Sequence, residues 1–156
     1  MSGIRLADIP DMADIVDLGR ELLEASVYAG LKPDEQKFKM TIAGLMGHKK
    51  GIVLVVVDDN NKPQGFLAGI TDEYGFSRAC FATDMWTYVR PGYRRYAYRL
   101  YNKFITWAAT KPRMAFIELA QSSGMGDHER WCRLMEKLGL HRVGSLYIMR
   151  VEKCPA

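Results

Sequence analysis

The stretch from Trp86 to Ala109 constrains the fold more than any other part of the chain. An aromatic and β-branched run ends at Val89, a Pro-Gly turn follows, and an amphipathic helix begins a few residues later. A strand that leads into a helix in this way brings free backbone N–H groups and the positive end of a helix dipole together. Arg94, Arg95 and Arg99 lie at this junction. The segment therefore predicts an α/β fold with a binding site for a phosphate-bearing ligand.

The length and composition favour one globular domain over residues 1–156. A hydrophobic content of 48% with 26% charged residues is ordinary for such a domain, and the chain is long enough to bury a core. The longest apolar run, Ile52 to Val57, is far shorter than the roughly 20 residues of a membrane span. The first twelve residues lack the apolar core of a secretory signal. We therefore expect no membrane partner.

The cysteines and histidines predict neither a disulfide framework nor a metal centre. Cys80, Cys132 and Cys154 are an odd number at wide spacings, and the three histidines are isolated from one another. This usage indicates reduced thiols in a cytoplasmic setting, with no metal cofactor. We expect Cys132 to lie on a helix with its side chain in the protein core, without a histidine partner.

The net charge of +4 has two explanations. Much of the positive excess is concentrated in residues 90–99, so a local site for a phosphate group accounts for it. The alternative is a nucleic-acid-binding face. It is disfavoured because neither a recognition-helix pattern nor an RNA-binding aromatic signature is present.

The remaining pattern predicts strands and helices in a mixed α/β layer, with helices on both faces of one sheet. Strands are expected at residues 4–6, 51–57, 64–71, 80–89, 114–120, 140–143 and 146–151, and helices at about 9–25, 34–46, 96–110 and 127–138. The continuous β-branched run at 51–57 predicts a strand that is buried on both faces. The strand at 114–120 is also expected to be buried.

Four stretches together resemble the GNAT-type N-acetyltransferase superfamily over nearly the whole chain. They are IRLADIPDMADIVDLG from Ile4, LVVVDDNNKPQGFLAG from Leu54, VRPGYR from Val89, and MEKLGL from Met135 followed by VG and YIMR. The resemblance implies a single-domain α/β fold with a mixed, mostly antiparallel sheet. It also implies a splayed central pair of parallel strands and helices on both faces.

The same resemblance implies that acetyl-CoA binds as a substrate between the strands that end at Val89 and Ala120. Backbone groups of Thr87, Tyr88 and Val89 would pair with the pantetheine arm. The residues expected around the pyrophosphate and adenine are Arg94, Arg95, Tyr96, Ala97, Tyr98 and Arg99. Ser122 either contacts the ligand or belongs to a plain flexible loop. Amides at a helix start bind phosphate without a particular side chain, and arginines add bidentate contacts.

The chain departs from the family's usual loop at two positions. Ala97 and Arg99 stand where the family usually has glycine or another small residue. Alanine is tolerated if the backbone there is helical, and is strained if φ is positive. For Arg99 we favour a loop shifted by one residue, with the side chain turned outward. The alternative is a weakened cofactor site.

Two carboxylates are the candidates for a catalytic base. Asp84 lies in its strand among apolar residues, where burial raises the pKa of a carboxyl group. The alternative is a solvent-facing position in an alternating strand. Glu118, in the next strand, is the second candidate. The family's general acid is often a tyrosine where this chain has Met135, which has no proton to donate.

The sequence thus predicts an enzyme that transfers an acetyl group from acetyl-CoA directly to a primary amine of a small molecule or protein. The alternative is a catalytically inactive protein of the same fold, which binds CoA or a macromolecule; Met135 and Arg99 indicate it, and a plugged groove would favour it. A homodimer through the apolar closing strand is a further expectation. The acidic residues Asp11, Asp14, Asp17, Glu21 and Glu24 are expected on the solvated face of the first helix, and the alternative is that they attract a polyamine or a lysine-bearing protein.

Overall fold

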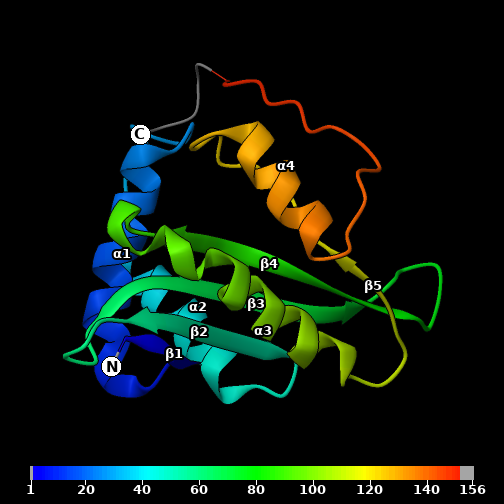
Figure 1. Ribbon diagram of the computed structural model, residues 1–156, viewed down its shortest axis with the longest axis horizontal. Helices are drawn as coiled ribbons and strands as arrows, with labels where there is room; N and C mark the ends of the chain where they lie inside the picture. Colours follow the sequence, from blue (N-terminus) through cyan, green and yellow to red (C-terminus); the bar gives the residue numbers. More distant parts are fainter. Residues whose placement is uncertain (1, 152–156) are drawn as a thin grey trace.

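The computed structural model describes residues 2–151, which form one five-stranded sheet between two layers of helices (Figure 1). The strands are β1 (Gly3–Leu6), β2 (Gly51–Val57), β3 (Pro63–Glu73), β4 (Cys80–Val89) and β5 (Met114–Glu118). The helices are η1 (Ile9–Asp11), α1 (Met12–Ala25), α2 (Glu35–Gly47), η2 (Pro91–Tyr96), α3 (Ala97–Ala109) and α4 (His128–Lys137). The strands lie in chain order, and every neighbouring pair is antiparallel except β4 and β5. The predicted mixed sheet is confirmed.

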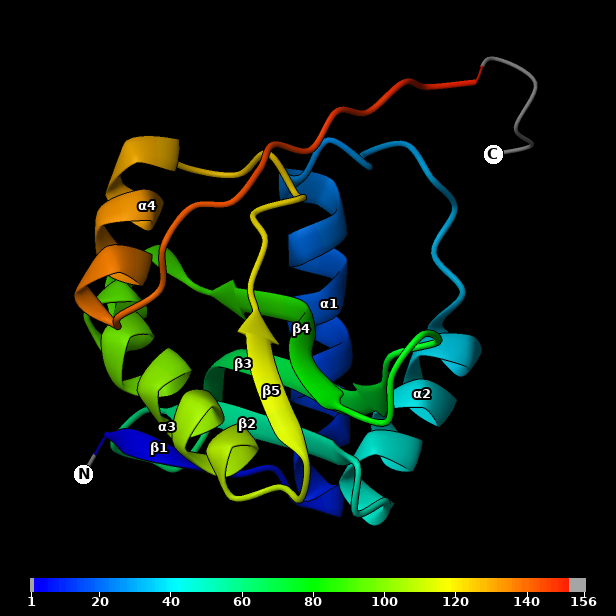
Figure 2. The ribbon, with the colours of Figure 1, turned by 90° about the vertical axis from the view of Figure 1, so that its right-hand side faces the viewer.

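The sheet separates two apolar cores, and β2 contributes to both. Val53, Val55 and Val57 pack under α1 and α2, while Leu54 and Val56 pack under α3. Alternate residues of a strand point to opposite faces, so a continuous apolar run fits a strand that is covered on both sides. Figure 2 shows α1 and α2 on one side of the sheet and α3 and α4 on the other. The expectation of a doubly buried strand is confirmed.

The parallel pair β4 and β5 separates partway along its length. Pairing runs only from Cys80 with Met114 to Thr83 with Glu118, although β4 continues to Val89. A bulge lies at the point of separation, because Ala68 of β3 pairs with Trp86 and the next residue of β3 pairs with Asp84. One extra residue of β4 is thereby inserted, which bends the strand. From Asp84 to Val89, β4 pairs with β3 on one edge, and no described strand covers its other edge.

The expectation of a buried strand at 114–120 is wrong. The strand ends at Glu118, and most of its residues are exposed, with Phe116 64% accessible to solvent. The reason is its position: β5 forms the edge of the sheet and pairs with β4 at only four positions.

The two expected closing strands, Leu140–Val143 and Leu146–Val151, are also not formed. Residues 140–151 have an extended pattern in the sequence but no strand assignment in the structure. A strand needs a partner backbone, and within residues 140–151 the only backbone hydrogen bond, from the Leu140 amide to the Met135 carbonyl, belongs to the end of α4. The apolar side chains on which the homodimer expectation rests are exposed there; they are Val143, Leu146, Tyr147, Ile148, Met149 and Val151. Cys154 lies outside the described residues.

Candidate functional site

A cavity of about 1230 Å³ opens where β4 and β5 separate. Its walls come from α1, the connection from α1 to α2, the start of α2, the free edge of β4, the η2–α3 junction, residues 120–127 and α4. The groove is open, and it is not plugged by side chains as the inactive alternative would require.

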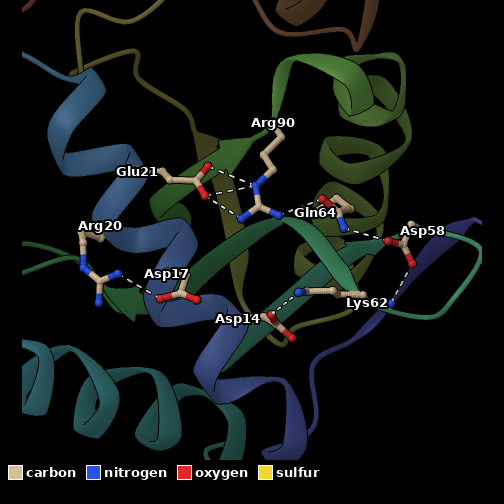
Figure 3. A network of polar contacts seen from close by, with 8 residues as sticks. All are labelled: Asp14, Asp17, Arg20, Glu21, Asp58, Lys62, Gln64 and Arg90. Atoms are coloured by element: carbon tan, nitrogen blue, oxygen red, sulfur yellow. Dashed lines mark hydrogen bonds and ion pairs between the residues drawn. The ribbon is translucent and has the colours of Figure 1, made fainter.

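A polar network joins the end of β4 to α1 and β3 (Figure 3). The Arg90 guanidinium donates hydrogen bonds of 2.6 and 3.1 Å to the Glu21 carboxylate, and one of 2.8 Å to Gln64. Gln64 in turn donates to Asp58 at 2.8 Å. Arg90 therefore holds the end of β4 in place against α1 and β3. It does not belong to a free basic patch over residues 90–99, on which the nucleic-acid alternative depends.

Asp17 and Glu24 are exposed on α1 as expected, whereas the expectation of a solvated face is wrong for Asp11, Asp14 and Glu21, which are at least partly buried and have basic partners. Asp11 is only 6% exposed and pairs with Arg5 at 2.6 Å. Asp14 lies 3.6 Å from the ammonium of Lys62, and Glu21 is held by Arg90. Arg5 lies on β1, Lys62 in the turn before β3 and Arg90 just after β4, and the last two are far from α1 in the sequence.

The loop after β5 forms another wall of the cavity and is held by the connection after α1. The amide of Val27 donates to the Ser123 carbonyl at 2.9 Å, and the Tyr28 hydroxyl donates to the Ser122 carbonyl at 3.3 Å. Gly124 has a φ of +66°, and a Cβ there would lie 2.4 Å from Val27, so this position requires glycine. The structure places Ser122 on the cavity wall.

The arginines at the helix junction separate into two groups. Arg94 and Arg95 line the cavity, and Arg95 also lies over the Tyr96 ring at 5.1 Å. Arg99 is exposed on α3 and is not among the cavity-lining residues. Ala97 has φ −56° and ψ −45°, so its methyl group causes no strain. Both observations agree with the interpretation in which Arg99 turns outward and alanine replaces glycine at little cost.

The other predicted ligand contacts divide in the same way. Thr87, Tyr88, Val89 and Tyr98 line the cavity. Tyr96 does not: its ring is buried, and its hydroxyl is hydrogen-bonded to the Ser2 hydroxyl. The Tyr96 ring therefore supports the start of α3 from beneath.

Asp84 is brought into the cavity by the bulge, on the side of β4 that carries Thr87. The Thr87 hydroxyl donates a hydrogen bond of 2.7 Å to its carboxylate. Burial raises the pKa of Asp84 to about 6, and the Thr87 bond opposes this shift. A carboxylate with such a pKa is ionised at neutral pH and accepts a proton readily. These properties suit a general base.

Tyr101 of α3 lines the cavity, although it is not among the site residues expected from the sequence. It is buried, and it lines the same cavity as Asp84. Burial first, and then the nearby Asp84 carboxylate, raises its pKa, so its hydroxyl remains protonated and able to donate. Its position on the apolar face of α3 is visible in the sequence, but its exposure to a cavity depends on the separation of β4 from β5.

Glu118 lies apart from Asp84. It is exposed at the end of β5, does not line the cavity, and accepts a hydrogen bond from the Tyr74 hydroxyl. This bond raises the pKa of Tyr74 to about 12. The structure therefore does not bring the two predicted carboxylates together.

Cys132 and Met135 both lie on α4, and neither lines the cavity. The sulfur of Cys132 is partly buried and lies 3.4 Å from the Nε2 of His128, one turn earlier, so the expectation of no histidine partner is wrong. Met135 is buried in the core beneath α3 and does not line the cavity. Cys132 does not line the cavity either.

Among residues 2–151, no three His, Cys, Asp or Glu side chains are placed to hold a metal ion. None of the helices in this range combines the length and the apolar character that crossing a membrane requires.

Neither a family model nor a curated protein matches the sequence. Solved structures match it over nearly the full length of both chains. A possible acetyltransferase from Clostridium difficile 630 has 17% identity, covers 97% of this chain and 98% of its own, and gives a TM-score of 0.69. The aminoglycoside 6'-N-acetyltransferase AAC(6')-Ih from Acinetobacter baumannii has 18% identity, coverages of 97% and 99%, and a TM-score of 0.70. Glucosamine-6-phosphate N-acetyltransferase from Arabidopsis thaliana has 11% identity, coverages of 98% and 99%, and a TM-score of 0.73.

Proposed function

We propose, from the GNAT-type N-acetyltransferase fold that this chain shares with those structures, that it transfers an acetyl group from acetyl-CoA to a primary amine. The observation that carries the proposal is the free edge of β4, from Asp84 to Val89, which opens into a cavity beside the end of β5. A pantetheine arm carries amide groups, and it can add to such an edge as an extra strand would. We assign Asp84, on the same edge, to the thioester end of that arm.

The phosphate end of acetyl-CoA is assigned to the η2–α3 junction. Arg94 and Arg95 line the cavity there, and Arg94 has no ion pair within residues 2–151. The amides of Tyr93 and Ala97 already donate to the carbonyls of Arg90 and Arg94. Recognition of the pyrophosphate therefore rests more on the two guanidinium groups than on loop amides. Bidentate arginine contacts suit phosphate oxygens.

The chemistry requires few groups. The neutral amine nitrogen attacks the thioester carbonyl carbon, a C–N bond forms, and the C–S bond breaks with its electron pair leaving on sulfur. The proton lost by the nitrogen passes, directly or through water, to Asp84. The leaving thiolate takes up a proton, for which we assign the Tyr101 hydroxyl as the donor, because it lines the same cavity as Asp84 and its raised pKa keeps it protonated. Backbone N–H groups on the free edge of β4 are the donors available to the oxyanion.

The test is calorimetric titration of the protein with acetyl-CoA, desulfo-CoA and ADP at two salt concentrations. The proposal expects acetyl-CoA and desulfo-CoA to bind at least tenfold more tightly than ADP, because the pantetheine arm contacts β4. It also expects only a modest salt dependence of this preference. Equal binding of every polyphosphate, lost as salt rises, would instead indicate a nonspecific basic surface. Absence of acetyl-CoA binding would overturn the proposal.

A further inference from the structure

We infer that the acetyl acceptor is a primary amine carried on an apolar or aromatic body, rather than a polycation such as an aminoglycoside or a polyamine. This inference rests on the proposed function and specifies the substrate of the same cavity. It follows from three features of the cavity wall: exposed apolar side chains, a rigid aromatic pair, and the distribution of charge.

The first feature is a set of large apolar side chains that stay accessible inside the cavity. Tyr28, Leu31 and Met85 are 36%, 41% and 39% exposed, respectively, and all three line it. They come from the α1–α2 connection and from the β4 bulge. Accessible apolar surface gathered in a concave site marks a place where an apolar ligand group is buried.

The second feature is an aromatic pair on the cavity wall. The Phe38 ring of α2 meets the Trp86 ring of β4 edge-on, with centroids 5.2 Å apart, and both line the cavity. Gly19 of α1 makes room for this arrangement, because a Cβ there would lie 2.7 Å from the Phe38 ring. Two rings held in a fixed orientation offer a flat apolar surface for a ligand ring at little cost in side-chain entropy.

The third feature is the charge on the wall. Six basic side chains line the cavity, namely Arg20, Lys32, Lys37, Arg94, Arg95 and Arg130, against four acidic ones, Asp34, Glu35, Asp84 and Asp127. Arg94 and Arg95 are assigned to the phosphates of acetyl-CoA, which leaves four basic and four acidic side chains, so the wall has no acidic excess to attract a ligand with several ammonium groups.

Most of the acidic side chains are also already engaged. Asp34 and Asp127 each accept a hydrogen bond from a backbone N–H in the first turn of the helix that follows, and Glu35 is paired with Arg20. Asp84 accepts a hydrogen bond from the Thr87 hydroxyl and pairs with no cation among the described residues. The cavity therefore has one carboxylate free to receive one amine, and an apolar wall to receive the rest of the molecule.

The test compares tryptamine and phenethylamine with kanamycin and spermidine. Acetyl-CoA-dependent thiol release gives kcat/KM for each amine, and calorimetry gives the binding of each amine to the protein alone. The inference expects kcat/KM for tryptamine to exceed that for kanamycin and spermidine at least tenfold. Equal or better use of kanamycin or spermidine would overturn it.

Leu31→Ala and Met40→Ala form the matched pair of variants. Leu31 lines the cavity, whereas Met40 is 67% exposed on α2 and does not line it. Both side chains are accessible, so neither truncation removes a core contact. Leu31→Ala is expected to weaken tryptamine binding about fivefold, because part of an apolar contact is lost, and Met40→Ala to leave it unchanged. Equal effects of the two variants would contradict the inference.

The design separates the two levels of the proposal. If acetyl-CoA does not bind, the proposed acetyl transfer fails, and the amine titrations still decide which ligand the cavity prefers. If acetyl-CoA binds and tryptamine does not bind at millimolar concentration, the acceptor inference alone is wrong.

Discussion

The Arg90 guanidinium at the exit of β4 and the Glu21 carboxylate of α1 are joined by three hydrogen bonds of 2.6 to 3.1 Å (Figure 3). The two residues are 69 positions apart in the sequence. Their contact fixes the strand that carries Asp84 against the helix that forms the opposite wall of the cavity. The ion pair therefore contributes both to stability and to the width of the site.

Replacing Glu21 with glutamine should lower the free energy of unfolding by about 1 kcal/mol. Charge-assisted bonds to arginine are worth somewhat more than this, but both side chains are about one third exposed, and solvent screens them. Urea denaturation at pH 7 measures the change. Arg20→Ala is the control, since Arg20 forms only exposed pairs with Asp17 and Glu35. A larger loss for Arg20→Ala would contradict this assignment.

Asp11 should make stability sensitive to acid. The hydrogen bonds from Arg5 hold the pKa of Asp11 below its ordinary value of 3.8. Its contribution is therefore fully present above about pH 4 and is lost as pH falls through the lower pKa of the folded state. Asp11→Asn should cost about 2 kcal/mol at pH 7, because the buried charge pair is broken. Urea midpoints at pH 7 and pH 3 test this: the difference between the native protein and the variant should shrink at pH 3.

Local patterns in the sequence were sufficient to predict most of the elements. The apolar face of α3 and the Asp127 cap of α4 predicted their helices, and the β-branched run predicted β2, because each signal acts within a few residues. The order of these elements together with the GNAT-like stretches also predicted the parallel pair of strands. These are properties of short segments and of their succession.

Long-range pairing could not be read in the same way. The bulge at Met85 depends on how β3 and β4 align, and the partner of Arg90 lies on a distant helix. The closing segment from Leu140 has strand-like composition, yet composition does not supply a partner backbone. Glu118 is still paired with Thr83, before the two strands separate, and so it lies outside the cavity that their separation opens. These features decide which predicted residues meet in the site.

Arg94→Ala should raise the KM for acetyl-CoA about tenfold or more, with little change in kcat. The guanidinium is expected to contact the pyrophosphate equally in the ground and transition states, so its loss weakens uniform binding. Arg99→Ala is the matched control, because Arg99 lies five residues further on but outside the cavity wall. Its KM should stay within about threefold of the unmodified protein. Steady-state kinetics at fixed ionic strength measures both, and an equal effect of the two variants would contradict the assignment of the phosphate site.

Asp84→Asn should reduce kcat/KM about 100-fold or more, because an amide does not accept the proton of the amine. In the unmodified protein, kcat/KM should fall as pH drops through about 6, where Asp84 takes up a proton, and this acidic limb should disappear in the variant. Glu118→Gln is the control, since Glu118 lies outside the cavity. If Glu118→Gln lost as much activity as Asp84→Asn, the assignment of Asp84 as the base would be wrong.

The Asp84→Asn variant should be more stable than the unmodified protein at pH 7.5. The pKa of Asp84 is raised in the folded state, so between about pH 4 and pH 6 the folded protein binds more protons than the unfolded chain. Stability therefore falls as pH rises through this window, and above it the full cost of the buried charge is present. Removing the charge should recover about 2 kcal/mol at pH 7.5 and nothing near pH 4. Urea denaturation at both pH values tests this. Lower stability at pH 7.5 would show that the carboxylate is held for its contacts, whereas the expected gain identifies a charge kept at a cost for its chemistry.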